Sequence, residues 1–138
     1  MKLWDKGFLI DQQIEKFTVG NDREIDMHIA KYDVQASLAH AIMLESIGII
    51  TADELKDLKR GLQELASDIE NGTFIIEESF EDVHSKIEWE LTDKVGEVGK
   101  KIHTARSRND QVLVALQLYY KENLAIINEK TRCFLILY

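Results

Sequence analysis

The sequence predicts an all-α protein, in which a small N-terminal helical domain is followed by the first part of one long helix. Proline, the residue that most often interrupts helices, is absent from all 138 residues. Apolar residues recur at steps of three and four over four segments, which is the period of one helix face. The last of these segments is also too long for a compact domain of this size, so we expect it to project from the domain.

The composition argues against several classes of protein. The chain has 17 Lys and Arg residues against 25 Asp and Glu residues, and this acidic balance argues against general nucleic-acid binding. A single cysteine, Cys133, excludes an internal disulfide or a cysteine zinc site. The sequence contains no apolar run of membrane-spanning length and no signal-peptide core. We therefore expect a soluble, cytoplasmic protein without a nucleic-acid or membrane partner.

Two helices are predicted in the first half of the chain. The first begins near Asp22 and ends at Gly48, which can form a left-handed cap. Its apolar face is predicted to comprise Ile25, Ile29, Tyr32, Ala36, Ala39 and Met43. The second helix begins at Thr51, whose side chain can form a capping box with Glu54, and it ends at Asn71-Gly72. Its buried stripe is predicted to comprise Leu55, Leu58, Leu62, Leu65 and Ile69.

Two further helices are predicted after a docking loop at residues 73–76. The third helix begins after Ser79, which can cap toward Asp82. Its buried side is predicted to comprise Val83, Ile87, Leu91, Val95 and Val98. The fourth starts at Asn109 or Asp110 and covers about 29 residues, or roughly 43 Å. Its two apolar stripes are wider than one helix can cover, so we expect it to pack against other chains or to belong to a longer protein.

A basic segment lies immediately before the fourth helix. Four of the 17 basic residues fall within nine positions there: Lys100, Lys101, Arg106 and Arg108. Helix N-termini attract anions, and arginines add bidentate donors for carboxylate or phosphate. Ser107 and Asn109 can cap the helix or donate to a ligand. These residues alone leave two interpretations, a small-anion site for carboxylates or a capped helix with solvated charges, and the second is the commoner for charge runs.

The ten residues 103–112, H-T-A-R-S-R-N-D-Q-V, resemble the first signature block of argininosuccinate lyases in the fumarase/aspartase superfamily. Segments 4–8, 32–40, 48–51 and 81–88 resemble other blocks of that family in the same order. Other superfamily members usually carry a serine–serine–asparagine-type sequence in place of the R-S-R pattern. The resemblance implies cleavage of argininosuccinate into arginine and fumarate by β-elimination, in arginine biosynthesis, without a metal or organic cofactor.

The resemblance also implies a substrate-binding role for the arginine-rich loop. Ser107, Arg108 and Asn109 would contact the succinate carboxylates, and Arg106 would support the loop or reach the substrate itself. Elimination requires removal of a proton next to a carboxylate. The doubly negative, enolate-like group that forms is stabilised by fixed positive charge and by N–H donors.

A second pair of site residues follows from the resemblance. Asp82 and His84 correspond to an acidic–histidine pair that lines the same cleft. Without the family match, Asp82 completes a helix cap and His84 is a structural histidine. His40 is expected on the helix surface or in packing, and His103 is expected to orient the loop by hydrogen bonding.

Some expected family features are changed or absent. Asp5-Lys6-Gly7 replaces the family's G-G-R, Gly20 falls near the position of a substrate-contacting serine, and Ala36 replaces a common glycine. The general acid, a histidine in a later block, and the general base, a serine in a proline-containing loop motif, are missing. We therefore expect the first third of a family member, with an N-terminal helical domain at 1–106 and the start of a truncated central bundle at 107–138.

The resemblance implies a homotetramer in which each active site combines segments from three subunits. This chain would supply one segment, so we expect it to be inactive alone and to self-associate. Two alternatives stay open. One is a non-catalytic helical assembly module, since lens crystallins related to the enzyme exist. The other is a different fumarate-releasing lyase, which the R-S-R pattern makes less favoured.

Overall fold

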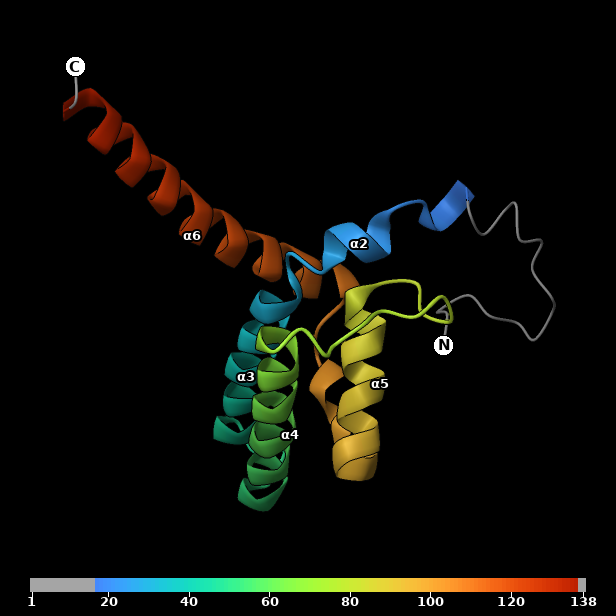
Figure 1. Ribbon diagram of the computed structural model, residues 1–138. Coiled ribbons are helices and arrows are strands. Elements are labelled where there is room, and N and C mark those ends of the chain that lie inside the picture. Colours follow the sequence, from blue (N-terminus) through green and yellow to red (C-terminus); the bar gives the residue numbers. More distant parts are fainter. Residues whose placement is uncertain (1–16, 137–138) are drawn as a thin grey trace.

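The computed structural model describes residues 17–136, and these residues form helices without any β-strand. The sequence-predicted all-α class is therefore confirmed. The elements in chain order are α2 (Asp22–Asp26), α3 (Ala30–Ser46), α4 (Ala52–Glu70), α5 (Val83–Val95), the 3₁₀ helix η1 (Gly96–His103) and α6 (Arg108–Ile136) (Figure 1). The opening motif at residues 4–8 lies outside the described residues.

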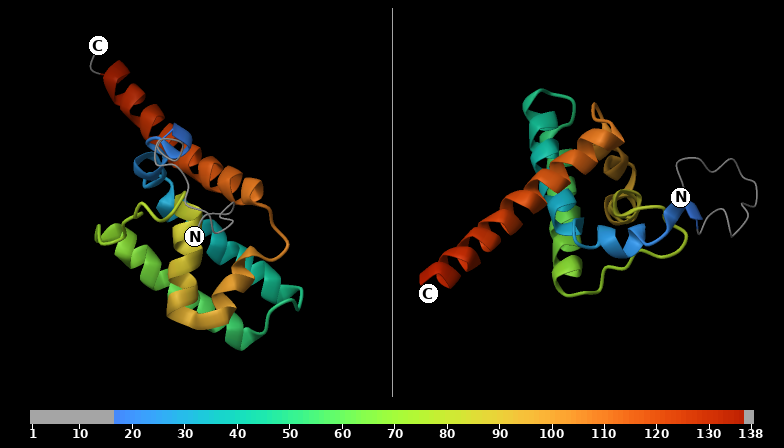
Figure 2. Two further views of the ribbon diagram at one scale, coloured as in Figure 1. Left: turned by 90° about the vertical axis from the view of Figure 1, so that its right-hand side faces the viewer. Right: turned by 90° about the horizontal axis from the view of Figure 1, so that it is seen from above.

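The helices α3, α4 and α5 form a compact body from which α6 projects. α3 and α4 lie side by side as an antiparallel hairpin, and α5 packs against α4 (Figure 1). α6 begins against α3 and then extends far beyond the other helices, which all three views show (Figure 2). The core is formed by apolar side chains from α3, α4, α5 and the loop before α5, including Leu44, Leu58, Leu65, Ile87 and Leu91.

The first predicted helix is two helices, α2 and α3, with a turn at residues 27–29. Its predicted apolar face was partly wrong, since Ile25, Ala39 and Met43 are exposed. The observed buried face comprises Ala30, Val34, Ser37, Ala41 and Leu44, with Tyr32, Asp33 and Ala36 beside it. The reason is that α3 is covered by both α4 and α6, and that it buries two polar residues which an apolar pattern cannot include.

The predicted limits of α4 are confirmed by its caps. The Thr51 hydroxyl accepts a hydrogen bond from the Glu54 amide at 3.2 Å, and Glu54 Oε2 accepts one from the Thr51 amide at 2.9 Å. Gly72 follows α4 and has a φ of 72°, the left-handed conformation that a cap glycine adopts freely. Gly48, which follows α3, has a φ of 75° in the same conformation. The predicted leucines of α4 are buried, while Ile69 is partly buried against the core.

The start of α5 differs from the prediction. Its N-cap is Asp82 rather than Ser79, because Asp82 Oδ1 accepts a hydrogen bond from the Ser85 amide at 2.6 Å. The preceding loop docks as predicted, with Phe74 and Ile76 buried and Ile75 exposed. The 3₁₀ helix η1 was not anticipated by the sequence pattern; it folds back along α5 and leads into the arginine-rich loop.

Gly99 allows η1 to lie directly against α5, and a larger residue there is expected to destabilise the protein. A Cβ atom at Gly99 would lie 2.6 Å from Thr92 Cα and 2.7 Å from the Thr92 amide nitrogen, so backbone would have to move. We expect Gly99→Ala to lower the free energy of unfolding by about 1–3 kcal/mol, the usual cost of overpacking. Gly72→Ala is the comparison variant, since space around Gly72 is open and only its positive φ is strained. Urea unfolding, monitored by circular dichroism, measures the free energy of unfolding of both variants. A loss in Gly99→Ala no larger than that in Gly72→Ala would contradict this prediction.

The length of the last helix is confirmed, because α6 contains 29 residues. It begins at Arg108, one residue before the predicted start, and Ser107 caps it through its Oγ, which accepts from the Asp110 amide at 3.2 Å. Only its first turns are buried, through Gln111 and Ala115. Leu124, Ile127, Phe134, Leu135 and Ile136 are exposed, so the apolar stripes of α6 are uncovered in the single chain. Among residues 17–136, no helix has both the length and the apolarity that a membrane crossing requires.

Candidate functional site

The loop at residues 104–107 is held at both of its ends. His40 Nε2 lies 2.8 Å from the Thr104 carbonyl oxygen, to which the neutral ring can donate. Burial lowers the pKa of His40, which favours this neutral ring. At the other end, Asp110 Oδ2 accepts from the Ser107 amide and hydroxyl, both at 2.8 Å. Between these ends Ala105 has a φ of 59°, a strained conformation for a residue with a side chain. His40 therefore anchors the loop, a contact that the predicted packing role did not include.

Arg106 belongs to this loop, and its side chain is half-buried. Its Nη2 donates to the Ser37 hydroxyl at 3.0 Å, and its buried Nε has no hydrogen-bond partner among the residues that the structure describes. Within residues 17–136 no carboxylate lies within ion-pair distance of Arg106. Burial lowers the pKa of Arg106, although not enough to remove its charge at neutral pH. A guanidinium held in this way has N–H groups available for an anion.

Arg108 joins the loop to the start of α5. Its Nη1 donates to Gln111 Oε1 at 3.0 Å, and its Nη2 donates to Ser85 Oγ at 3.2 Å. Its Nε lies 3.8 Å from Asp82 Oδ2. Asp82 therefore caps α5 with one carboxylate oxygen and faces Arg108 with the other. The structure thus brings together Asp82 and Arg108, which are distant in the sequence.

The loop before Asp82 is held in place by a buried lysine, Lys86. Lys86 Nζ lies 2.7 Å from Glu77 Oε2 and 2.9 Å from Glu90 Oε1, and it sits over the rings of Phe80 and Trp89. Burial acts to lower the pKa of Lys86, but the hydrogen bonds that its ammonium group donates to the two carboxylates outweigh burial and raise the pKa. Lys86 therefore stays charged, and it ties the loop before Asp82 to the first turns of α5.

His84 lies beneath the loop and is paired with an acid that the sequence analysis did not identify. The His84 Nδ1 atom lies 2.8 Å from Asp33 Oδ2, and the two side chains are almost fully buried. Gln111 Nε2 donates to both oxygens of Asp33, at 3.0 and 2.9 Å, and Ser37 Oγ donates to Oδ1 at 3.3 Å. Asp33 and Ser37 are four residues apart on a predicted helix, and this polar pair beside an apolar face was the signal that could have revealed them.

The predicted site residues therefore differ in their exposure. Ser107 and Asn109 are exposed at the N-terminus of α6, and Arg106, Arg108 and Asp82 are partly buried around them. His84 is 2% exposed, so it lies below the surface that the others form. His103 lies among the same charged side chains, and burial lowers its pKa. The site is a surface of donors and cations at a helix start, which suits a small carboxylate ligand.

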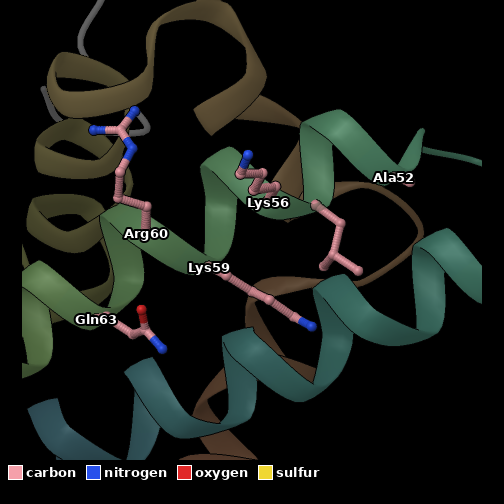
Figure 3. A pocket seen from close by; sticks show the side chains of 6 residues that line it. Ala52, Lys56, Lys59, Arg60 and Gln63 are labelled. Atoms are coloured by element: carbon pink, nitrogen blue, oxygen red, sulfur yellow. The ribbon is translucent and has the colours of Figure 1, made fainter.

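A second basic area lies on α4 and is separate from this loop. Lys56, Lys59 and Arg60 surround a shallow hollow there, together with Ala52, Leu55 and Gln63 (Figure 3). Arg60 is already 3.5 Å from Asp57 and 3.6 Å from Glu64. Within the described part of the chain, no buried hydrogen bond holds the side chains of this area, so we assign no site to it.

The antiparallel hairpin of α3 and α4 and the helix α5 together position an arginine-rich loop at the start of the long helix α6. A family model described as "Lyase" matches residues 10–135, and the chain belongs to this lyase family. Two bacterial argininosuccinate lyases are similar to it. The Phocaeicola vulgatus protein is 51% identical over 129 residues, which cover 94% of this chain and 29% of that protein. The Bacteroides thetaiotaomicron protein is 52% identical over 128 residues, which cover 93% of this chain and 29% of that protein.

A third argininosuccinate lyase shows a similar degree of identity. The argininosuccinate lyase of Thermotoga neapolitana is 52% identical over 128 residues, which cover 93% of this chain and 32% of that protein. The resemblance to argininosuccinate lyases is therefore confirmed over most of the chain. The chain spans less than a third of the length of these curated relatives.

Proposed function

We propose that this chain is the N-terminal part of an argininosuccinate lyase, which cleaves argininosuccinate into arginine and fumarate in arginine biosynthesis. The observation that carries this proposal is the segment 106–109, which joins the loop to α6 and whose two arginines are held by hydrogen bonds to Ser37 and Gln111. The names of the relatives support it. We place the helical domain with this loop at 1–106 and the start of the central bundle at 107–138. The proposed enzyme is a cytoplasmic homotetramer.

The proposed site binds the succinate part of the substrate. Ser107 and Asn109 offer exposed donors to its carboxylates, and Arg106 and Arg108 add positive charge beside them. Asp82 orients Arg108 from α5. These groups would stabilise the negative charge that grows on a carboxylate when the neighbouring carbon loses its proton. This role needs no metal or organic cofactor.

His84 completes the proposed site from below. Its ring is linked to Asp33 and, through Gln111, to Arg108, so it supports the donors that meet the substrate. The proton-transfer residues of the family have no counterpart in this chain. Each such residue contributes roughly 10²–10⁴-fold to the rate, so we expect no measurable turnover by the chain alone.

A full-length chimera tests the proposed function. In it, this chain replaces the matching 29% of the Bacteroides thetaiotaomicron relative. We expect the chimera to release fumarate from argininosuccinate and the isolated chain to release none. Ultraviolet absorbance measures the fumarate that is released. The unaltered relative is the positive control. Turnover by the isolated chain would overturn the expected inactivity.

The chimera also separates the alternative functions. A chimera that assembles but releases no fumarate from any substrate would favour a helical assembly module. Fumarate release from a substrate with a different leaving amine, but not from argininosuccinate, would indicate another lyase. Either result would contradict the proposed function.

A further inference from the structure

Asp33 is a buried carboxylate that is surrounded by hydrogen-bond donors. Its exposed fraction is 0%, and its neighbours are the His84 ring, the Gln111 amide group and the Ser37 hydroxyl. An ionised carboxylate only accepts hydrogen bonds, so this set of partners matches the charged form. A buried charge persists where its hydrogen bonds are satisfied and opposite charge lies near. We propose that Asp33 is the positioning residue that ties His84 and both arginines of the loop into one unit.

Two short hydrogen-bonded paths connect Asp33 to the arginines. On one path, Arg106 Nη2 donates to Ser37 Oγ at 3.0 Å, and Ser37 donates to Asp33 at 3.3 Å. On the other, Arg108 Nη1 donates to Gln111 Oε1 at 3.0 Å, and Gln111 donates to Asp33 at 2.9 Å. Each guanidinium thus reaches the same buried negative charge through one neutral side chain.

This indirect arrangement matters for ligand binding. A direct ion pair with Asp33 would occupy the guanidinium N–H groups and reduce their attraction for another anion. A neutral side chain between them orients each arginine by hydrogen bonding and leaves other N–H groups for a carboxylate. The charge of Asp33 also acts on Arg106 from a distance and favours its charged form. We expect the arginines to be preorganised before the ligand arrives, which lowers the cost of binding.

Asp33 also determines which nitrogen of His84 carries a proton. Because Asp33 only accepts, the His84 Nδ1 atom must donate, and this atom therefore carries a proton. The other ring nitrogen, Nε2, takes no part in the hydrogen bond to Asp33. The catalytic consequence of this arrangement rests on the proposed function, whereas the position of the proton does not.

Replacement of Asp33 by asparagine tests the inference in the chimera. The amide N–H group of asparagine must face at least one donor from His84, Gln111 or Ser37, and the negative charge is lost. We expect Asp33→Asn to lower kcat/KM by about 10- to 100-fold, mainly through KM, in keeping with the loss of hydrogen bonds to a charged group. Ser37→Ala, which removes only the path to Arg106, is expected to have a smaller effect of about 3- to 10-fold. Asp93→Asn changes the charge equally at an exposed position of α5 and should leave kcat/KM unchanged.

Nuclear magnetic resonance of the 138-residue chain gives a readout that does not depend on activity. With ¹⁵N-labelled histidine, we expect the His84 ring to carry its proton on Nδ1, and to shift to the Nε2-protonated form in Asp33→Ala. A wild-type His84 with its only proton on Nε2 would overturn the inference, as would an Asp33→Asn chimera with wild-type kcat/KM. A wild-type chimera that assembles but is inactive, with the Nδ1 proton in place, would reject the proposed function and support the link between Asp33 and His84. If Asp33→Asn does not fold, the proton position on the wild-type His84 ring and the kcat/KM of Ser37→Ala still test the inference.

Discussion

Asn109→Ala in the full-length chimera should lower kcat/KM for argininosuccinate by about a hundredfold or more. Removal of one donor that faces a developing negative charge typically costs about 10²–10³-fold in rate. The Asn109 side chain is exposed at the start of α6, so its loss should barely change the melting temperature. Steady-state fumarate release and thermal unfolding measured on the same samples separate these two effects.

A matched variant makes this result specific to the loop. Asn71→Ala removes an exposed asparagine just after α4, outside the site, and should leave kcat/KM unchanged. Arg108→Ala should also reduce kcat/KM strongly, and it should lower the melting temperature, because it removes hydrogen bonds to Gln111 and Ser85. Full activity in both Asn109→Ala and Arg108→Ala would show that the loop is only a helix cap.

Replacement of two exposed apolar residues of α6 by lysine should abolish self-association of the isolated chain. Leu124 and Ile127 are 61% and 58% exposed, and they lie on the same uncovered apolar stripe. Burial of a large aliphatic side chain contributes about 1.5–3 kcal/mol, so several such residues can drive association of two or more copies. We expect the wild-type chain to associate with rising concentration and Leu124→Lys/Ile127→Lys to remain monomeric. Sedimentation velocity over a concentration series measures both.

The control for this experiment lies on the opposite side of the same helix. Glu129→Lys changes the net charge by the same two units as the double variant, but at an exposed polar position. It should associate like the wild type, with the same helical content by circular dichroism. A monomeric wild-type chain at high concentration, or a double variant that still associates, would contradict the expected packing of α6.

Local sequence signals predicted the elements whose ends are determined by nearby residues. The Thr51–Glu54 capping box and the leucine spacing of α4 act over a few positions, and the structure has both. The buried face of α3 was harder to predict because α3 is covered by both α4 and α6. The sequence pattern could not distinguish Ser79 from Asp82 as the N-cap of α5, because both residue types cap helices. In the structure Asp82 is the N-cap, since the docked loop places it at the start of the helix.

The candidate site shows the same division. The arginine-rich loop is contiguous, so its residues and its place before a long helix could be predicted from the chain. The hydrogen bonds that join Asp33 to His84 and Gln111 could not be predicted in this way, since these residues lie 51 and 78 positions away from Asp33. The sequence alone determined the helical class, the helix caps with short-range signals and the basic loop, because these depend on neighbouring residues. Only the tertiary structure decided which polar side chains meet beneath that loop, because their pairing depends on how α3, α5 and α6 pack around one buried charge.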